Sequence, residues 1–385
     1  MIRLERVSKV FPGSPAPAVD QVTMEVPAGE ICVLLGPSGC GKTTTMKMVN
    51  RLIEPTSGEI FIDGKNTADR NAVELRRSLG YVIQQIGLFP NKTIEDNICV
   101  VPDILGHDKA TSRKRAAELL EMVALDPSIF LKRYPKELSG GQQQRIGVLR
   151  AIAHDPPVLL MDEPFGAIDP INRAVIQDEF LKMQAQLKKT IMFVSHDIDE
   201  AVKMADRIAI FKDGKLIQYD TPDDLLSHPA NDFVKGFVGR DRALKRLQLV
   251  TVSEVLETES SVVTAEDSLT TALQRMDDAG YERAIIVVDG NDRPVGYISR
   301  SVATTTKGKC GQHSYNLRTV VRPEDDLRTV ASKMFTHDAT WLPCVSEQGK
   351  LMGVVTQRGI THYLGATYKS SRSDDQNVRR FRVAT

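Results

Sequence analysis

A glycine-rich loop has the residue types and the spacing of a phosphate-binding site. It follows the apolar run 31–35, precedes a helical pattern, and consists of Gly36, Pro37, Ser38, Gly39, Cys40, Gly41, Lys42, Thr43 and Thr44. Its glycines let backbone N–H groups converge on a phosphate at a helix N-terminus, Lys42 neutralises phosphate charge, and the Thr43 hydroxyl can bind Mg²⁺. We therefore predict a nucleoside triphosphate site in which Cys40 is a small loop residue and not a nucleophile.

Two adjacent carboxylates follow a second apolar run. Asp162 and Glu163 come directly after 158–161, and an α/β sheet binds its ligands beyond the carboxyl ends of its strands. We predict that Asp162 holds Mg²⁺ and that Glu163, which points elsewhere, polarises the attacking water. Such a pair alone would usually be the solvated start of a helix, but the phosphate loop upstream favours the catalytic interpretation.

A serine and two glycines open a further helical pattern. Ser139, Gly140, Gly141 and Gln142 form a second helix N-terminus at which backbone N–H groups and the helix dipole favour an anion. The chain therefore carries two predicted phosphate cradles.

These segments need a sheet that presents them along one edge. The continuously apolar runs 31–35, 158–161 and 190–194 are typical of strands buried on both faces. The run 207–211 passes through a hairpin signal into a further strand, and helical spacing of apolar residues predicts a helix over 113–125. The alternation predicts an α/β fold, a parallel or mixed sheet covered by helices, with an inserted helical subdomain.

The composition excludes several classes of protein. The 385 residues, 41% of them hydrophobic, suffice for two or more domains. Fifty basic residues balance fifty acidic ones, so no broad binding to nucleic acid is expected. No apolar run approaches the roughly 18 residues of a membrane span, and no export signal begins the chain. The five scattered cysteines show no disulfide or zinc spacing. We expect a cytoplasmic protein with ordinary buried thiols.

The segment 138–142 is identical to the signature of the ATP-binding cassette (ABC) family, and residues 1–240 resemble its ATPase domain. The resemblance implies a P-loop ATPase fold: a RecA-like core with a β-subdomain and a helical subdomain. It also implies that Phe11 stacks on adenine, with an ordinary core role as the alternative.

The same resemblance assigns two further residues. Gln84 fits the loop glutamine that contacts Mg²⁺ and senses the membrane partner, although Gln85 can exchange roles with it. His196 fits the switch histidine near the γ-phosphate. A loop histidine is the alternative, but its place after the strand that follows Glu163 favours the switch.

The segments 50–55, 80–90 and 165–170 resemble the ATPase subunits of osmoprotectant importers, which handle glycine betaine, choline and carnitine. The last segment differs from the broad cassette pattern but keeps Asp169 and its role at the dimer. In this family the signature of one subunit caps the ATP of another. The resemblance thus implies a homodimer, two integral-membrane permease subunits and an extracytoplasmic solute-binding protein. It also implies a peripheral place on the cytoplasmic face of the bacterial inner membrane.

The C-terminal part of the chain repeats itself. The segments 286–299 and 343–356 match, with Gly296 and Gly353 placed 57 residues apart. Apolar positions recur as well, because Leu269, Ala272 and Met276 correspond to Leu327, Val330 and Met334. We predict two copies of a small α+β unit of the form βαββα, with chance likeness of amphipathic segments as the alternative.

Each copy resembles the cystathionine β-synthase (CBS) domain, a pair of which is regulatory in several osmolyte importers. Nucleotide-binding copies carry a ribose-binding aspartate three residues after a Ser or Thr. Here Ser299 is followed by Val302, and Thr356 by Gly359, so we expect weak or no mononucleotide binding. A packing or dimerisation module is one alternative. A sensor of ionic strength or of a cyclic dinucleotide is the other.

We predict an ATPase domain over 1–240, a linker over 241–250, CBS domains over 251–308 and 309–368, and a flexible basic tail over 369–385. Five basic residues outnumber two acidic ones in the tail, namely Lys369, Arg372, Arg379, Arg380 and Arg382 against Asp374 and Asp375. A solvated tail is the default. The alternative is contact with anionic lipid that is released as salt rises.

Three functions compete. The leading hypothesis is a transport motor that hydrolyses ATP, with a compatible solute or another small polar solute as cargo. A soluble cassette protein of repair or translation commonly carries two cassettes, a coiled coil or strongly basic surfaces, and the sequence shows none of these. A nucleotide sensor centred on the repeat is disfavoured by the missing acids at Val302 and Gly359.

Overall fold

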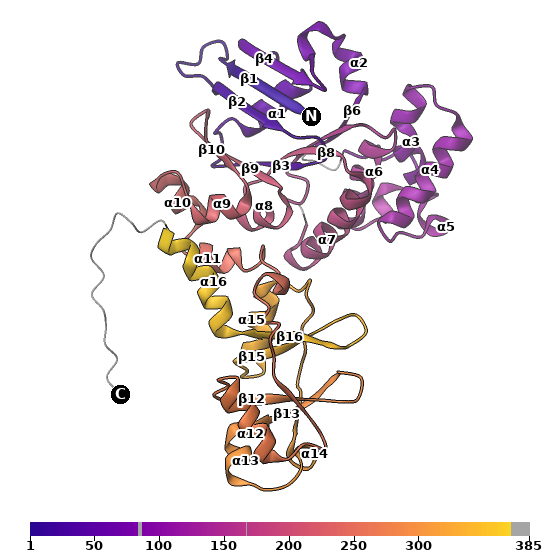
Figure 1. Ribbon diagram of the computed structural model, residues 1–385. Helices are drawn as coiled ribbons and strands as arrows, with labels where there is room; N and C mark the ends of the chain where they lie inside the picture. The colour runs from indigo at the N-terminus through magenta and orange to yellow at the C-terminus, as the bar shows by residue number, and fades with distance from the viewer. Residues whose placement is uncertain (84–86, 167, 371–385) are drawn as a thin grey trace. The chain divides into compact units, whose positions relative to one another are not determined.

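The structure is a computed structural model that describes residues 1–83, 87–166 and 168–370. The chain divides into two compact units, one spanning Met1–Gly239 and one that begins at Arg240 (Figure 1). Among the described residues, no helix combines the length and the apolar content needed to cross a membrane.

An antiparallel sheet forms one layer of the first unit. Its strand order in the described residues is β2-β1-β4-β5, comprising β1 (Ile2–Lys9), β2 (Val19–Val26), β4 (Ser57–Ile62) and β5 (Lys65–Asn66). Alternate residues such as Val22, Met24 and Val26 are buried, as expected when one face of a strand covers the core. This sheet is the β-subdomain that the family resemblance implied.

The second sheet of this unit positions the candidate site. Within the described chain its order is β10-β9-β3-β8-β7-β6, comprising β3 (Ile31–Leu35), β6 (Leu79–Val82), β7 (Val158–Asp162), β8 (Thr190–Val194), β9 (Arg207–Lys212) and β10 (Lys215–Asp220). The pairs from β9 to β6 are parallel, and only β10 pairs antiparallel. Strands β3, β7 and β8 are buried at every residue. The predicted mixed sheet with doubly buried strands is confirmed.

A helical group is inserted between β6 and β7, on the right of Figure 1. It contains α3 (Ile94–Ile104), α4 (Lys109–Met122), α5 (Pro127–Phe130), η2 (Pro135–Glu137) and α6 (Gly140–Ile152). The helix predicted over 113–125 is α4. It starts earlier because the Asp108 side chain accepts a hydrogen bond from the Thr111 N–H at 2.8 Å and so satisfies an orphan donor of the first turn.

The remaining helices of the first unit cover its sheets. They are α1 (Lys42–Val49), η1 (Thr67–Asp69), α2 (Ala72–Arg77), α7 (Pro170–Leu187), α8 (Ile198–Met204), α9 (Pro222–Ser227) and α10 (Asp232–Val238).

The second unit contains the predicted repeat. The first copy comprises β11 (Val262–Thr264), α12 (Leu269–Asp278), β12 (Ala284–Val288), β13 (Pro294–Ser299) and α13 (Arg300–Thr305). The second comprises α15 (Leu327–Thr336), β15 (Trp341–Val345), β16 (Leu351–Thr356) and α16 (Gln357–Ser370). A single parallel bridge between Val321 and Cys344 stands where the first copy has β11. The matched apolar positions of α12 and α15 lie in two separate cores, as the repeat predicted.

Burial shifts the boundaries that we expected inside this unit. Residues 241–250, expected as a linker, form α11 (Arg242–Arg246) and place Leu247 and Val250 in the core of the second copy, just before η3 (Val252–Glu254). Beyond residue 308, α14 (Cys310–His313) buries Cys310 in the core of the first copy, and β14 (Tyr315–Asn316) pairs with β13. Each copy therefore draws apolar residues from outside its expected range.

All five cysteines lie in the described residues, buried and without disulfides. Burial raises the pKa of Cys32 to about 12 and that of Cys344 to about 11. These values fit the ordinary buried thiols expected from their spacing.

Candidate active site

The loop between β3 and α1 folds tightly because two of its glycines have no room for a side chain. A Cβ at Gly36 would lie 2.2 Å from the Phe211 carbonyl oxygen, and one at Gly41 would lie 2.4 Å from that of Ala18. Both have positive φ, 145° and 101°, which only glycine adopts without strain. The glycines thus let the loop curl and turn its N–H groups toward one point.

Lys42 begins α1 and is held at the floor of this loop. Its side chain is buried, with its Nζ donating to the carbonyl oxygens of Gly36 at 2.7 Å and Pro37 at 2.8 Å. Cys40 Sγ lies 3.7 Å from the same nitrogen. Its role as a small packing residue remains our expectation, because burial raises the pKa of its thiol despite the neighbouring ammonium.

Thr43 and Asp162 meet across two neighbouring elements. The Thr43 hydroxyl donates to Asp162 Oδ1 at 3.1 Å. Burial raises the pKa of the Asp162 carboxyl above its ordinary value, while the Thr43 hydrogen bond and nearby lysines oppose that shift. A hydroxyl beside a buried carboxylate is a pair of oxygen donors that a hard cation can use.

Glu163 occupies a turn with an uncommon backbone. Its φ is 48°, in the left-handed region that few non-glycine residues adopt. Its N–H donates to the Val194 carbonyl at 3.1 Å, and its carbonyl accepts from Gly166 N–H at 3.2 Å. These bonds hold the backbone of the turn at Glu163, whereas the Asp162 carboxylate, one residue earlier, accepts from the Thr43 hydroxyl.

His196 lies beside that carboxylate, with Nδ1 at 3.7 Å from Glu163 Oε1 and 64% of its side chain exposed. The turn that carries it is anchored from within, because the buried Ser195 hydroxyl donates to Glu200 and accepts from the Asp197 N–H at 3.0 Å. Gln177 of α7 donates to the other oxygen of Glu200 at 3.0 Å. The sequence alone gave no signal for Glu200 and Gln177.

One cavity of about 310 Å³ unites these groups. Its lining consists of Ala18, Ser38, Gly39, Cys40, Gly41, Lys42, Thr43, Thr44, Glu163 and His196. It lies where β3, β8 and β7 end side by side, because adjacent parallel strands point their carboxyl ends at the same edge. A cation, backbone N–H groups at a helix N-terminus and a nearby carboxylate suit transfer of a phosphoryl group to water.

Comparisons with known proteins agree with this chemistry. Residues 19–166 match the ABC transporter family, and residues 252–301 and 318–366 match the CBS domain. Over 371 residues the chain is 56% identical to the osmoprotectant import ATP-binding protein OsmV of Salmonella typhimurium, with 95% of this chain and 97% of that protein covered. The chain belongs to the ABC transporter ATPase family. Over 381 residues it is also 45% identical to the glycine betaine/carnitine/choline transport ATP-binding protein OpuCA of Bacillus subtilis, covering 98% and 99% of the two chains.

A solved structure supports the fold of this ABC ATPase. The dimeric bacterial ABC transporter cassette MJ0796 has a TM-score of 0.52 and 35% identity to it, covering 57% of this chain and 98% of that one. The same cassette is also known in a post-hydrolysis state with ADP and Pi. The chain is therefore an ATPase, and the loop before α1 has the motif and the position expected of a phosphate-binding loop.

The signature segment of the ABC ATPase forms the N-terminus of α6. Ser139 Oγ accepts from the Gln142 N–H at 3.3 Å, and Gln142 Oε1 accepts from the Ser139 N–H at 3.0 Å. This capping box fixes the helix start. A Cβ at Gly140 would meet nothing within 4 Å. None of the four signature residues lines the phosphate cavity of the same chain.

The other family positions are placed as follows. Phe11 is 38% exposed with Lys9 Nζ 5.3 Å from its ring centroid, so it is not a core residue. Asp169 directly precedes α7, and its carbonyl accepts from Arg173 N–H at 2.9 Å. Gln84 and its alternative Gln85 lie outside the described residues.

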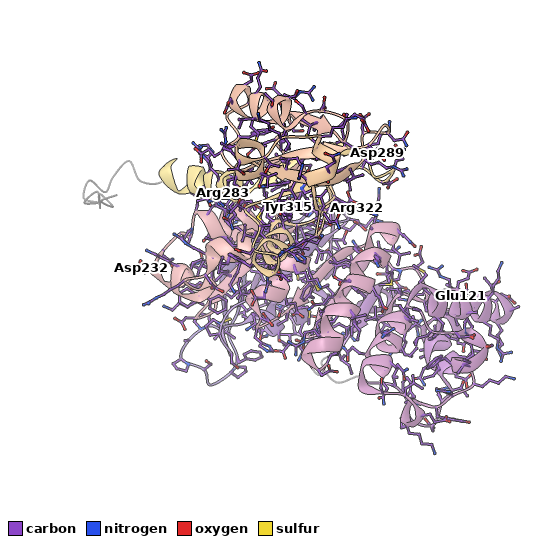
Figure 2. All side chains as sticks on the ribbon, turned by 90° about the horizontal axis from the view of Figure 1, so that it is seen from below. Glu121, Asp232, Arg283, Asp289, Tyr315 and Arg322 are labelled. Atoms are coloured by element: carbon purple, nitrogen blue, oxygen red, sulfur yellow. The ribbon has the colours of Figure 1, made fainter. Side chains whose placement is uncertain are left out.

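In the CBS pair an acidic residue, Glu257, lies beside Gly359, the position at which nucleotide-binding copies carry an aspartate. Thr356 accepts from the Gly359 N–H at 2.9 Å and donates to Glu257 Oε1 at 2.7 Å. Glu257 also lines a cavity of about 540 Å³ between the two copies. Arg283, labelled in Figure 2, bridges the same copies by donating to Thr340 Oγ1 at 3.2 Å. Sequence spacing missed Glu257 because it lies 99 residues before Thr356.

Proposed function

We propose that this ABC ATPase energises the import of a quaternary-amine osmoprotectant, such as glycine betaine, choline or carnitine, through separate permease subunits. The observation that carries the proposal is a cavity lined by the phosphate loop, Glu163 and His196 in a chain that is 56% identical to OsmV along almost its whole length. Two further relatives with 45% identity are named for transport of choline or of glycine betaine, carnitine and choline.

Each side chain of the cavity has a separate task in hydrolysis. Lys42 and the loop N–H groups hold the β- and γ-phosphates. The Glu163 carboxylate orients the water and accepts its proton as the γ-phosphoryl group leaves ADP. His196, 3.7 Å from that carboxylate, contacts the γ-phosphate. The acid that binds the metal and the acid that activates water are thus adjacent in sequence but face different partners.

Thr43 and Asp162 fit a Mg²⁺ ion. Their oxygens lie 3.1 Å apart, and Mg²⁺ in ATP sites usually takes few protein ligands and completes its shell with phosphate and water. When bound, the ion neutralises phosphate charge that develops during transfer. Gln84 is proposed as a further contact.

Two chains are proposed to form a homodimer with composite sites. The signature residues Ser139, Gly140, Gly141 and Gln142 then cap the ATP of the other protomer, next to its Asp169. The support is that the signature N-terminus is exposed and lies outside this chain's own phosphate cavity. The related MJ0796 cassette is described as dimeric.

The proposed assembly also contains two integral-membrane permease subunits and an extracytoplasmic solute-binding protein. The ATPase would then be peripheral on the cytoplasmic face of the cell membrane. The expected basic tail falls largely on 371–385, outside the described residues. Contact of this tail with anionic lipid stays a prediction.

Regulation is proposed for the CBS pair. Val302 and Gly359 stand where nucleotide-binding copies carry aspartates, and Gly359 is accompanied by Glu257. We still expect weak or no AMP binding, because Glu257 already accepts the hydrogen bond of Thr356. Calorimetry on the full chain with AMP tests this point, and micromolar affinity would contradict it.

Uptake measurements test the proposed transport. Cells that lack other osmoprotectant importers should accumulate labelled glycine betaine, choline or carnitine when they express this chain with its permease and binding protein. Lys42→Ala should abolish uptake without removing the complex. An active ATPase that supports uptake of none of the three solutes would instead point to another small polar solute.

A further inference from the structure

A buried glutamine links the signature helix to the turn of Glu163. Gln144 lies on α6 with 2% exposure, and its Nε2 donates to the carbonyl oxygen of Pro164. Pro164 directly follows Glu163. The helix that begins with the signature is thus tied to the backbone beside the proposed general base.

Stability alone does not account for a glutamine at this place. Gln144 Oε1 is buried and has no hydrogen-bond partner in the described part of the chain, and a buried unsatisfied oxygen is destabilising. The neighbouring cavity of about 20 Å³ is lined mainly by apolar groups such as Ile176, Phe180 and Met183. A side chain of the same length without polar atoms would suit these surroundings better, so the amide serves another purpose.

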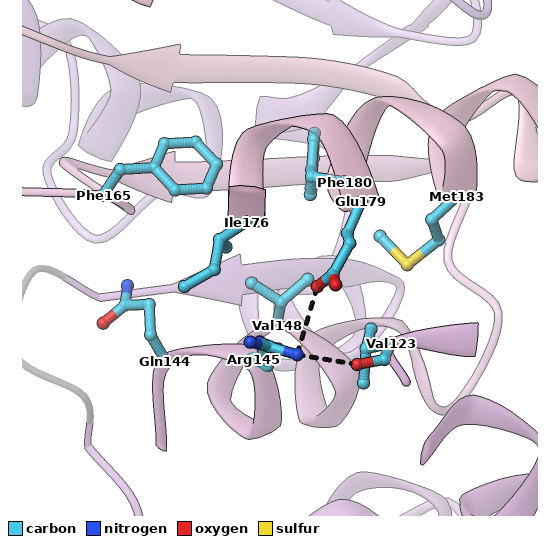
Figure 3. Close-up of a pocket in the computed structure, with 9 residues that line it drawn as sticks. All are labelled: Val123, Gln144, Arg145, Val148, Phe165, Ile176, Glu179, Phe180 and Met183. Atoms are coloured by element: carbon cyan, nitrogen blue, oxygen red, sulfur yellow. Dashed lines mark hydrogen bonds and ion pairs between the residues drawn. The ribbon is translucent and has the colours of Figure 1, made fainter. Parts of the chain in front are cut away.

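Further contacts join α6 to α7. Figure 3 shows Arg145 of α6 between Glu179 of α7 and Val123, at 3.1 Å from the carboxylate and 2.9 Å from the carbonyl oxygen. A Cβ at Gly141 would lie only 3.2 Å from Ile176 Cδ1. Because the two helices approach this closely, a displacement at the signature is passed to its surroundings.

The turn at the other end of the Gln144 bond is also held by aromatic packing and by a backbone hydrogen bond. Phe165 packs edge-on against Phe180 at 5.9 Å and Phe193 at 6.4 Å between ring centroids. Glu163 has φ 48° and is hydrogen-bonded to β8 through its N–H. The bond from Gln144 to Pro164 is a direct polar contact between α6 and this turn in the described part of the chain.

We propose that Gln144 is a positioning residue that sets the Glu163 carboxylate according to the position of the signature helix. When the nucleotide of one protomer binds the signature of the other, α6 of that other protomer would shift. This shift would then position Glu163 in the ATP site of the protomer that carries the signature. The two composite sites are coupled in this way. The inference rests on the proposed homodimer and on the proposed role of Glu163.

Gln144→Met removes the donor and keeps the length of the side chain. We expect kcat to fall about tenfold or more, since small displacements of a catalytic group reduce rates strongly. The KM for ATP should stay within about twofold. If the two sites are coupled as proposed, the rate should depend on ATP in a sigmoidal way in the wild type and in a hyperbolic way in the variant. The matched control is Gln184→Met, which removes another buried amide that donates to backbone carbonyls, those of Gly29 and Lys189. This control should keep wild-type kinetics.

A double variant separates positioning from general damage. In single-turnover hydrolysis, Gln144→Met combined with Glu163→Gln should be as slow as Glu163→Gln alone within about twofold, because the carboxylate that Gln144 positions is already gone. Multiplied losses, or wild-type kcat and cooperativity in Gln144→Met, would overturn the inference. If Gln144→Met does not fold, Gln144→Glu, which cannot donate when ionised, takes its place. Full activity of Glu163→Gln alone would instead overturn the proposed role of Glu163.

Discussion

The two glycine-rich helix starts of the cassette differ in what their glycines avoid. In the loop before α1, a Cβ at Gly36 or Gly41 would collide with backbone oxygen of the same chain at 2.2 and 2.4 Å. At the start of α6, a Cβ at Gly140 would meet nothing within 4 Å. The first cradle is closed by its own chain at Gly36 and Gly41, whereas the second is open at Gly140.

This difference separates glycines needed for folding from those needed for binding. Folding requires Gly36 because no other residue fits its positive φ and its close contacts. No contact within the described chain requires Gly140, and the capping box of Ser139 and Gln142 already fixes its helix. The proposed dimer would account for a glycine at 140, because the ATP of the other protomer would approach it from outside.

Removing the Lys42 ammonium from the phosphate loop should have the largest effect. Lys42→Ala removes the ammonium that Gly36 and Pro37 hold in place, and no neutral residue replaces a point charge near phosphate. We expect loss of ATP binding and at least about a thousandfold loss of hydrolysis. Wild-type affinity for Mg·ATP, measured by calorimetry, would contradict the assignment.

Alanine at the two glycines tests the comparison directly. Gly36→Ala should destabilise the cassette by about 4 kcal/mol or prevent folding, because its Cβ overlaps the Phe211 carbonyl. Gly140→Ala should change the free energy of unfolding by less than about 1 kcal/mol, since the site is exposed helix. It should nevertheless lower hydrolysis and ATP-dependent dimerisation. Denaturant unfolding and size-exclusion chromatography check both variants. Full activity of Gly140→Ala would contradict the assignment of the signature to the ATP site.

Glu163→Gln should trap a dimer in which ATP lies between the phosphate loop of one protomer and the signature of the other. The amide cannot accept the proton of water, so we expect ATP binding to persist while hydrolysis slows by about a hundredfold. Sizing with ATP and magnesium should show a dimer. Persistent monomers under these conditions would count against the composite sites.

Replacing the buried carboxyl of Asp162 should have the smallest effect. Burial raises the pKa of Asp162, so the native state binds that proton more tightly than the unfolded chain. The contribution of the Asp162 carboxyl to the free energy of unfolding therefore falls as the pH rises from its pKa in the unfolded chain through its raised pKa in the folded chain. Asp162→Asn should stabilise the nucleotide-free chain by about 1 kcal/mol near neutral pH. Thermal unfolding should show this gain shrinking in acid, and a gain that grows in acid would reverse the sign.

Local patterns predicted a phosphate site at the loop around Lys42 and two acids with separate roles after β7, whereas His196 was assigned through the family resemblance. In the structure all three segments follow buried strands, and their roles stay predictions. Apolar spacing also revealed the repeat, because Leu269 and Leu327 begin helices that pack in the same way. Such signals are short-ranged, so a linear sequence carries them.

Contacts between residues that are distant in the sequence became visible in the three-dimensional structure and not in any local pattern. Gln144 reaches Pro164 across 20 positions, Glu257 reaches Thr356 across 99, and Leu247 joins a core beyond its expected domain. These contacts depend on how helices and strands pack against one another, and no local period encodes such packing. A local pattern therefore predicts what a segment can bind, whereas the fold fixes which segments lie together and which glycines that arrangement requires.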